Sequence, residues 1–488
     1  MTIPIPAALH QLINGSWVPG TGAELISVNP SRPHEVVARG SSATAAEVET
    51  AVTAASAARA GWAAIPMHQR GSILTAAAAV VDSRADEWGR ELASEEGKTL
   101  AEAVAEVRRS AQILRYYGNE GDRQAGEIYS SPRPGEQILV TRKPIGVVGV
   151  ITPFNFPIAI PAWKIAPALI YGNTVVWKPA STVPLLATRL AEAFCTAGLP
   201  DGVLNLLLGD ADVGDAIVHH HAVDAVTFTG STGIGRRIAS ACAERGVPAQ
   251  AEMGGKNASI VLDDADVDLS VEQVLLGAFR SSGQKCTATS RLILTPGIAD
   301  RFLTALCAAT NALVVGDPIE TTTQMGPVVS AQACETIIAA IESAIDAGAV
   351  LHAGGSAMAR ADRGYFIAPT VLELDEQPAR VWADELFGPV LAVRRARDVA
   401  HAFALANDSE YGLSAAIFTQ DLTHALRAVE DIDVGVLHVN SESAGADPHV
   451  PFGGAKKSGL GPKEQGSAAR EFFTHTNTVY LRSGMVRS

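Results

Sequence analysis

The sequence predicts an α/β protein in which helices cover both faces of parallel sheets. Apolar, β-branched runs begin near residue 145 and recur at intervals of roughly 20–30 residues, with helical stretches between them. Such alternation is typical of parallel sheets. The chain has 488 residues, of which 47 % are hydrophobic and 18 % charged, so it has enough apolar surface for more than one core.

The N-terminal part is predicted to be mainly helical after a short lead. Residues 44–60 and 71–82 are alanine-rich with helical periodicity, and residues 82–126 continue this periodicity with mixed charges. Residues 128–142 contain Pro132 and Pro134 and then alternate, which predicts a loop followed by an exposed strand.

Strands and helices then alternate in two α/β regions. The predicted strands of the first region are 145–152, 173–180, 202–209, 222–230 and 248–255, with a helix at 185–197. The second region covers about 257–452, with strands at 290–296, 368–374, 388–396, 414–419 and 434–440. Residues 476–482 alternate like an exposed strand, which pairs either with the strand near 136–143 or with another subunit. In open parallel sheets, a ligand is expected at the carboxyl ends of the strands.

Composition excludes several classes of protein. The net charge of −14 argues against a nucleic-acid partner, which needs a basic face. Five irregularly spaced cysteines fit a reducing, cytoplasmic compartment better than a disulfide framework. The N-terminus lacks the features of a signal peptide. The most apolar stretch, residues 158–177, contains Lys164 and Asn173 and is predicted to be a buried helix and strand, so no membrane association is expected.

Three side chains stand out as candidates for chemistry. Cys286 lies in a Gly- and Ser-rich segment beside Lys285, and small polar neighbours with a cation favour an accessible thiolate. Glu252 lies among apolar neighbours, which raise the pKa of a carboxylate as a general base requires. Asn155, flanked by phenylalanines and prolines, is a fixed amide suited to donate to an oxyanion. The other four cysteines lie in alanine-rich helical stretches and are expected to be small core residues.

Signatures for nucleotides and metals are weaker. No run fits the common dinucleotide fingerprint or the P-loop. In residues 228–235, Gly230 allows close backbone approach, and Ser231 either caps the following helix or meets an anion at its N-terminus. The triplet His219–His221 has no further ligands at a zinc-like spacing, so it predicts a polar helix end and no metal site.

Seven ordered motifs make the chain resemble the aldehyde dehydrogenase superfamily. They are ITPFNFP (151–157), WKPAS (177–181), FTGSTGIG (228–235), EMGGKN (252–257), GQKC (283–286), ELFGPV (385–390) and PFGGAKKSGLG (451–461), and the resemblance extends from about residue 12 to 481. It implies a Rossmann-like, parallel-sheet cofactor domain over 1–126 and 145–254. It also implies an α/β catalytic domain over 255–465 and a small β oligomerisation arm of 127–144 and 466–488. Alternating segments in such an arm expose edges that pair, so a homodimer or homotetramer is expected.

The resemblance implies NAD(P)-dependent oxidation of an aldehyde to a carboxylic acid. Cys286 attacks the aldehyde as a thiolate, and Asn155 with the backbone N–H of Cys286 holds the oxyanion of the thiohemiacetal. Hydride transfer leaves a thioester, and Glu252 activates the water that hydrolyses it. Acyl transfer to coenzyme A is disfavoured because such relatives generally lack the base at position 252. The presence of all three side chains argues against a non-catalytic binding protein.

The resemblance also implies a cofactor site. Lys178 is expected at the adenosine ribose, Glu385 and Phe387 at the nicotinamide side, Gly230 and Ser231 at the pyrophosphate and Ile234 at the adenine. The remaining residues of the predicted site are Ile151, Thr152, Pro153, Phe154, Ala180, Ser181, Met253 and Gly254.

Two positions of this site depart from the family pattern. NAD-preferring relatives often carry Glu at the position of Ser181. The carboxylate of such a Glu would repel the 2′-phosphate of NADP, whereas the small neutral Ser181 does not. NADP is therefore expected to be preferred over NAD, and a site that uses both cofactors is the alternative. Phe154 replaces a frequent Trp, which is a conservative change.

Residues 155–180 and 461–474 resemble the 2-oxoglutarate semialdehyde (2,5-dioxopentanoate) dehydrogenases, whose product is 2-oxoglutarate. Arg280 supports an acidic semialdehyde because a guanidinium binds a distal carboxylate, although a structural ion pair is the alternative. Succinic semialdehyde dehydrogenases also resemble the chain but usually carry Arg at the position of Trp163. A third option is a pocket for aromatic or varied aldehydes around Trp163. The predicted substrate-binding residues are Phe156, Trp163, Arg280, Lys285, Thr287, Ser443 and Phe452, with the loop 441–447.

Overall fold

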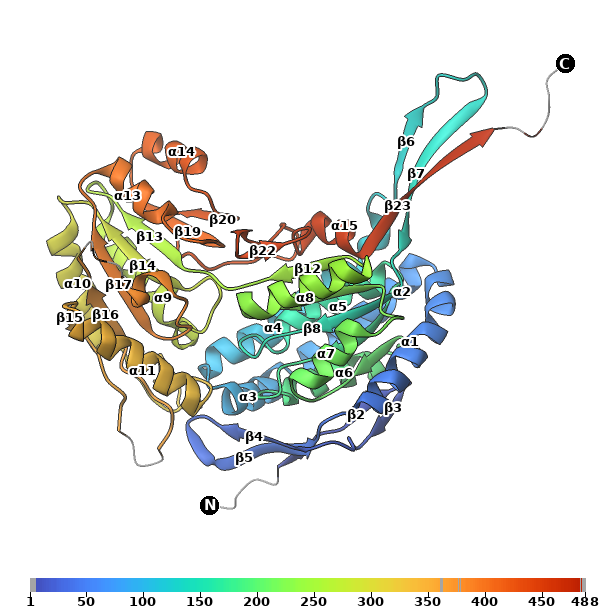
Figure 1. Ribbon diagram of the computed structural model, residues 1–488, viewed down its shortest axis with the longest axis horizontal. Helices are drawn as coiled ribbons and strands as arrows, with labels where there is room; N and C mark the ends of the chain where they lie inside the picture. The colour runs from blue at the N-terminus through green and yellow to red at the C-terminus, as the bar shows by residue number, and fades with distance from the viewer. Residues whose placement is uncertain (1–5, 360–362, 376, 378, 483, 485–488) are drawn as a thin grey trace.

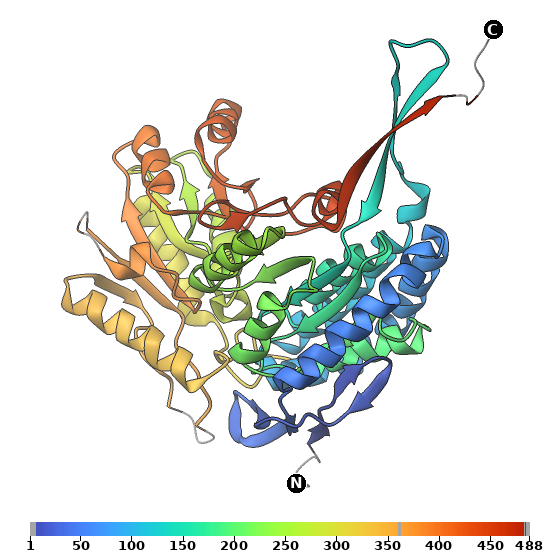
Figure 2. The ribbon, with the colours of Figure 1, turned by 45° about the vertical axis from the view of Figure 1, so that its right-hand side comes forward.

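The computed structural model describes residues 6–359, 363–375, 377, 379–482 and 484. Two large sheets covered by helices lie side by side, and a narrow β arm projects from the first of them (Figure 1). The arm also stands clear of the rest of the molecule after a 45° turn of the view (Figure 2). The predicted α/β class with a small β arm is therefore confirmed.

The first sheet has eight strands, and its five central strands are parallel. Across the sheet they are β22 (Gly459–Leu460), β12 (Ala249–Glu252), β11 (Ala225–Thr229), β8 (Val147–Ile151), β9 (Thr174–Lys178), β10 (Leu204–Leu206), β2 (Gln11–Ile13) and β3 (Ser16–Val18). After β8, the chain adds β9 and then β10 on one side of it. The chain then places β11 and β12 on the other side of β8. The order therefore reverses between β8 and β11, which is where open α/β sheets bind ligands.

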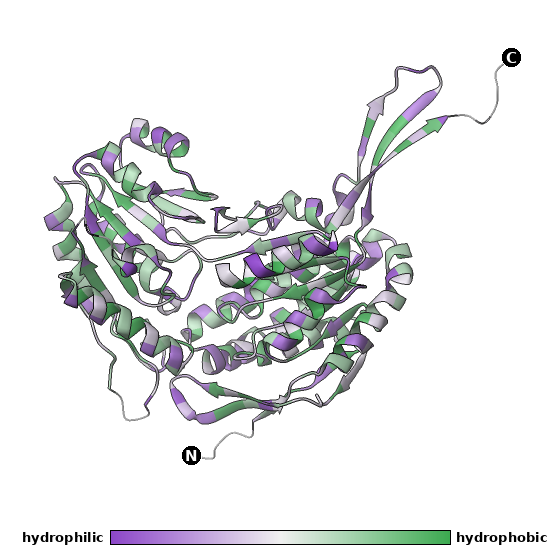
Figure 3. Ribbon diagram, viewed as in Figure 1, coloured by the Kyte–Doolittle hydropathy of each residue, from purple (hydrophilic) through white to green (hydrophobic). Residues whose placement is uncertain are grey.

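Helices cover both faces of the first sheet. One face carries α2 (Met67–Ser83), α3 (Ala85–Glu96), α4 (Leu100–Gly118), α5 (Ala159–Ile170) and α6 (Leu185–Thr196), and the other carries α1 (Ala45–Ala64), α7 (Ala211–His219) and α8 (Thr232–Arg245). In β8, Val148 and Val150 pack in the first core and Val147 in the second, because successive side chains of a strand point to opposite faces. Burying each of these side chains contributes roughly 1.5–3 kcal/mol. Hydrophobic residues follow the strands of both large sheets in Figure 3.

The second sheet has seven strands, and only its β15–β16 pair is antiparallel. The strands are β15 (Val350–Ala353), β16 (Thr370–Glu373), β17 (Val390–Arg395), β14 (Thr289–Leu294), β13 (Asn257–Val261), β19 (Ser414–Phe418) and β20 (Val436–Val439). One face packs on α11 (Ala331–Asp346), α12 (Arg380–Ala383), α13 (Val399–Asn407) and α14 (Leu422–Asp431), and the other on α9 (Val267–Phe279) and α10 (Ala299–Ala312).

The arm consists of β6 (Glu127–Ser130), β7 (Glu136–Pro144) and β23 (Thr474–Arg482), and it follows η1 (Glu120–Asp122). β23 pairs with β7 along its full length, antiparallel, from Thr474 opposite Pro144 to Arg482 opposite Glu136. The expected pairing within the chain is therefore present. Before β23, η3 (Gly466–Ala468) and α15 (Ala469–Phe473) lead the chain back past the first sheet (Figure 1).

Two smaller sheets complete the described structure. β1 (Ala7–Ala8), β5 (Arg32–Ser41) and β4 (Glu24–Asn29) form one, and β18 (Tyr411–Gly412) pairs with β21 (Ala455–Lys456) in the other. The five strands before α1 were not predicted. Four of them have six residues or fewer, and the ten-residue β5 is only partly buried and lacks a clear alternation. Residues 82–126 are not continuously helical, because α3 ends at Gly97 in a left-handed conformation and α4 ends at Gly118.

The apolar stretch 158–177 forms the buried α5 and most of the buried β9, as predicted. Among the described residues, we find no helix with both the length and the apolar character needed to cross a bilayer.

Candidate active site

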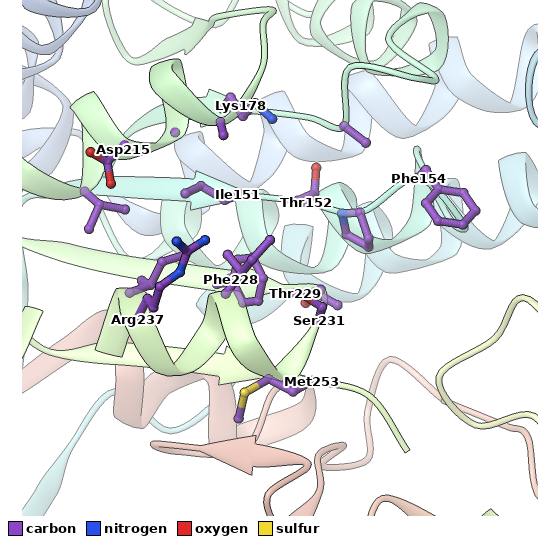
Figure 4. Close-up of a pocket in the computed structure, with 18 of the residues that line it drawn as sticks. Ile151, Thr152, Phe154, Lys178, Asp215, Phe228, Thr229, Ser231, Arg237 and Met253 are labelled. Atoms are coloured by element: carbon purple, nitrogen blue, oxygen red, sulfur yellow. The ribbon is translucent and has the colours of Figure 1, made fainter. Parts of the chain in front are cut away.

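A cavity of about 1130 Å³ opens at the carboxyl ends of β8, β9 and β11, where the strand order reverses (Figure 4). All fourteen residues predicted to bind a cofactor line it, namely Ile151, Thr152, Pro153, Phe154, Lys178, Ala180, Ser181, Gly230, Ser231, Ile234, Met253, Gly254, Glu385 and Phe387. Asn155 and Cys286 also line it. The fold thus gathers motifs that lie far apart in the sequence.

Charged side chains surround one end of this cavity. Lys178 is buried at the end of β9, and burial lowers the pKa of its ammonium, whereas Asp210 acts in the opposite direction. Figure 4 shows Arg237 of α8 on the wall opposite Lys178, with Asp215 of α7 on the Lys178 side. This end therefore presents two cations and several carboxylates to a ligand.

The other end holds aromatic rings and a glutamate. Phe154 and Phe387 meet edge to face, with ring centroids 5.6 Å apart. Glu385 accepts a hydrogen bond from the backbone N–H of Gly255 at 3.0 Å, and burial raises the pKa of its carboxyl to about 7. A Cβ atom at Gly254 would lie 1.9 Å from a Glu385 oxygen, so a side chain here would displace this carboxyl.

Cys286 follows η2 (Arg280–Gly283), in which Ser281, Ser282 and Gly283 all have left-handed φ values. Asn257 fixes the loop by donating to the carbonyl oxygen of Cys286 at 2.8 Å. Burial, followed by the negative charges of Glu385 and Glu252, raises the pKa of the thiol to about 12. The expectation of a thiolate stabilised by Lys285 is therefore wrong.

The Lys285 side chain pairs with other groups instead of the thiol. Its ammonium is buried and lies 3.4 Å from the carbonyl oxygen of Leu276 and 3.5 Å from a Glu442 oxygen. Burial lowers the pKa of this lysine, and Glu442 partly offsets that effect. The cation next to Cys286 in sequence thus pairs with Glu442.

Asn155 is buried between the two loops of the site. Its amide nitrogen donates to the carbonyl oxygen of Gln284 at 2.9 Å, two residues before Cys286. The backbone carbonyl oxygen of Asn155 accepts a hydrogen bond from the Lys98 ammonium at 2.7 Å. The amide has a second N–H, which suits it to donate to an additional oxygen.

Glu252 ends β12 and does not line the cavity. Its carboxylate accepts from the backbone N–H of Gly454 at 3.0 Å. Burial raises the pKa of Glu252 well above its usual value and the charge of Glu464 adds to this, whereas Gly454, Lys463 and Lys164 lower it. Glu464 itself forms a buried ion pair with Lys164. The expected rise in the pKa of Glu252 is thus observed.

The residues predicted to bind substrate form small packed groups, and none lines the cavity. Trp163 and Phe452 have ring centroids 5.8 Å apart, and Phe156 lies beneath the Lys98 ammonium at 4.2 Å. The Ser443 hydroxyl donates to the carbonyl oxygen of Thr287 at 2.8 Å.

Arg280 is exposed and pairs with Glu442 at 3.0 Å and with Glu102 at 3.6 Å. The structural ion pair considered as the alternative for Arg280 is therefore present. Arg280 and Lys285 both form ion pairs with Glu442, an acidic residue of the loop 441–447.

Comparison with known proteins identifies the family. Residues 17–479 match the model of the aldehyde dehydrogenase family. The chain belongs to the aldehyde dehydrogenase family. It is 41 % identical over 474 residues to the alpha-ketoglutaric semialdehyde dehydrogenase of Bacillus subtilis, covering 96 % of this chain and 97 % of that protein. It is 38 % identical over 475 residues to the 2,5-dioxopentanoate dehydrogenase of Saccharolobus solfataricus, covering 96 % and 99 %.

Solved aldehyde dehydrogenase structures agree with this assignment. The crystal structure of betaine aldehyde dehydrogenase from Staphylococcus aureus in complex with NAD+ matches with a TM-score of 0.94 at 32 % identity, covering 98 % of this chain and 96 % of that chain. The chain is thus an NAD(P)-dependent aldehyde dehydrogenase, and its cofactor is a nicotinamide dinucleotide.

The cavity of this aldehyde dehydrogenase fits such a cofactor. Among the described residues, the Lys178 ammonium has no hydrogen-bonding partner although it is buried, and the buried Thr229 hydroxyl on the cavity wall also lacks one. Both are therefore free to bind the ribose and phosphate oxygens of a dinucleotide.

Sequence reasoning missed several charged residues of this aldehyde dehydrogenase site. Arg237 follows Ile234 by three residues on α8, so helical periodicity could have placed it on the same wall. Asp210 and Asp215 could have been found in the same way from α7. Glu442 had no such local signal, because its partners come from a distant helix end.

Proposed function

We propose that this enzyme oxidises 2-oxoglutarate semialdehyde to 2-oxoglutarate with NADP or NAD as the hydride acceptor. The observation that carries the reaction is the placement of Cys286 and Asn155 on one cavity wall, with Glu252 close enough to raise the pKa of the thiol. The substrate is supported by the relatives named above, whose sequences are 38–41 % identical to this chain.

Cys286 is the nucleophile. The thiol proton passes to solvent water, the sulfur bonds to the aldehyde carbon, and the π electron pair of the C=O bond moves to the oxygen, which becomes an oxyanion. The free N–H of the Asn155 amide and the backbone N–H of Cys286 donate to this oxyanion. Because the thiol pKa is raised to about 12, the resting group is a protonated thiol, and its deprotonation is part of the activation barrier.

Glu252 is the general base for the second half of the reaction. A nicotinamide dinucleotide held by the cavity residues, among them Lys178, Glu385 and Phe387, would supply the hydride acceptor, and Cys286 would then carry the acyl group as a thioester. Glu252 takes a proton from water, the water oxygen bonds to the acyl carbon, and the C–S bond then breaks. The carboxylic acid is released, and the departing sulfur takes up the proton held by Glu252, which restores the thiol and the carboxylate. The raised pKa of Glu252 makes it a stronger base than an exposed carboxylate.

The acidic end of the substrate is assigned to Arg280 and Lys285. Both cations meet at Glu442, so the site already binds a carboxylate in the protein itself. A distal substrate carboxylate competes with Glu442 for the same cations. The packed pair Trp163 and Phe452 favours a second candidate, an aromatic or broad-specificity aldehyde dehydrogenase.

NADP is the proposed preferred cofactor. Ser181 adds no negative charge near Lys178, and Arg237 on the opposite wall has no ion-pair partner among the described residues. Asp210 and Asp215 act against this preference by repelling a 2′-phosphate. The expected preference is therefore moderate, with NAD also accepted.

The proposed assembly is a cytoplasmic homodimer or homotetramer. The arm exposes Ile128, Tyr129, Tyr480 and Leu481 beside open strand edges, which favour pairing with another copy. Free cysteines throughout the described chain agree with a reducing compartment. A monomer in light scattering would contradict the role of the arm.

The test is kcat/KM for 2-oxoglutarate semialdehyde, succinic semialdehyde and benzaldehyde, each with NADP and with NAD. The proposal expects the C5 oxo-acid semialdehyde to be favoured and Cys286→Ser to abolish turnover of every aldehyde. A preference for benzaldehyde would overturn the substrate and leave the aromatic pocket as the specificity site.

A further inference from the structure

The first two turns of α4 contact both loops of the active site. The loop that carries Asn155 precedes α5, and the loop that carries Cys286 follows α9. Neither loop belongs to a strand or a long helix at its functional residue, so their separation has to be set by other contacts. Lys98, Glu102 and Glu106 supply such contacts from one short stretch of chain.

Lys98 and Glu106 hold the Asn155 loop at both of its ends. The Lys98 ammonium donates to the carbonyl oxygen of Asn155 at 2.7 Å and to one Glu106 oxygen at 2.5 Å. The other Glu106 oxygen accepts from the backbone N–H groups of Ile158 and Ala159, each at 3.2 Å. One buried ion pair therefore fixes the carbonyl at the start of this loop and the first amides of α5.

Glu102 holds the Cys286 loop from the same helix. One of its oxygens accepts from the backbone N–H of Ser281 at 2.9 Å, while the other caps the start of α4 at Thr99. Ser281 has a left-handed φ of 52°, a conformation that is unfavourable for a residue with a side chain. The hydrogen bond from Glu102 helps to maintain this turn, which leads directly to Cys286.

Burial makes these contacts unusually rigid. The side chains of Lys98 and Glu106 are 1 % and 2 % exposed, and the ammonium lies over the Phe156 ring. When its partner moves, a buried charge loses far more stabilising free energy than an exposed charge does. The α4 start therefore favours one separation between the two loops.

We propose that Lys98, Glu102 and Glu106 are positioning residues that fix the Asn155 amide relative to Cys286. This inference rests on the proposed function, because it needs Asn155 to stabilise the oxyanion. Displacing a catalytic group by about 1 Å costs roughly a hundredfold in rate. Lys98 and Glu106 thus act on the oxyanion step through the Asn155 loop, and Glu102 acts through the Cys286 loop, without any of them touching the substrate.

The test is a double-mutant analysis of kcat with Asn155→Ala. Glu106→Gln keeps both hydrogen bonds to α5 but removes the negative partner of Lys98, and Lys98→Met removes the donor to Asn155. We expect each to lower kcat tenfold or more, with the KM for NADP and the alkylation rate of Cys286 by iodoacetamide unchanged. In the Asn155→Ala background, neither should lower kcat further. Glu106→Gln supplies the comparison by itself if Lys98→Met does not fold.

Glu91→Gln is the control, because Glu91 forms an ion pair with Arg189 between α3 and α6, away from both loops, although this pair is more exposed than Lys98–Glu106. It should leave kcat unchanged. If the effects of Glu106→Gln and Asn155→Ala multiply, or if Glu106→Gln keeps wild-type kcat, the positioning role is wrong. If Asn155→Ala itself keeps wild-type kcat, the oxyanion role in the proposed function fails instead.

Discussion

The cofactor side and the substrate side of this site are built differently. The cofactor side is a preformed cavity whose residues come from strand ends and helix starts of the first sheet. The substrate side consists of paired rings and ion pairs whose members come from distant loops. Dinucleotide recognition is thus fixed by backbone geometry, whereas aldehyde choice is set by side chains that a few substitutions can change.

The largest effect is expected where the two sides meet, at Glu252. Glu252→Gln removes the base but keeps an acceptor for the N–H of Gly454. Steady-state kcat should fall by about 10²–10⁴-fold, while the first turnover still yields reduced cofactor. Stopped-flow absorbance of the reduced nicotinamide checks this. Loss of the first-turnover burst as well would place Glu252 before hydride transfer.

The next largest effect probes the cofactor side alone. Lys178→Met removes a buried ammonium from the cavity wall. Because a hydrogen bond to a charged group contributes about 1.5–3 kcal/mol, the KM for the cofactor should rise about ten- to a hundredfold. The KM for aldehyde should not change. Lys457→Met, at an exposed ion pair with Glu410, is the control and should alter neither constant.

A smaller effect is expected on the substrate side. Glu442→Gln weakens the competitor for Arg280 and Lys285. The KM for the acidic semialdehyde should fall by about three- to tenfold, equivalent to about 0.7–1.4 kcal/mol. The KM for benzaldehyde should stay constant. An equal change for both aldehydes would show that these cations do not bind the substrate carboxylate.

The smallest effect is a shift in pH dependence. Glu464 raises the pKa of Glu252, so Glu464→Gln should lower that pKa. Hydrolysis needs the Glu252 carboxylate and increases as the pH rises through its pKa. The acidic limb of the single-turnover hydrolysis profile should therefore move to lower pH. A shift to higher pH would contradict the role of Glu464 in raising the pKa of Glu252.

The contrast between the two sides also explains what the sequence could predict. Local motifs identified Gly230, Lys178 and Glu385, because strand ends and glycine turns bring such residues to a cavity in a known way. The direction of Lys285 could not be predicted, since it depends on Glu442 from a loop more than 150 residues later. The raised pKa of Cys286 was missed because it depends on burial of the thiol and on Glu385 and Glu252, which the fold brings near it from other parts of the chain.

The fold shows a similar division. Most strands of the two α/β regions were predicted close to their observed positions, because buried strands are continuous apolar runs. The buried strand β13 of the second sheet was not predicted. Short edge strands such as β1 and β22 were not predicted. Their residues lack a periodic pattern, and their pairing depends on neighbours supplied by other parts of the chain.

The antiparallel pairing of β22 with β12 has a consequence for biosynthesis. The edge strand β12, which ends in Glu252, is translated about 200 residues before its partner. At about 5–20 residues per second, a ribosome needs roughly 10–40 s to supply β22. During that interval β12 is an open edge, and Gly454, which binds the Glu252 carboxylate, has not yet been made. The Glu252 carboxylate therefore lacks this hydrogen-bond donor, and β12 lacks this neighbouring strand, until about 200 further residues have been added.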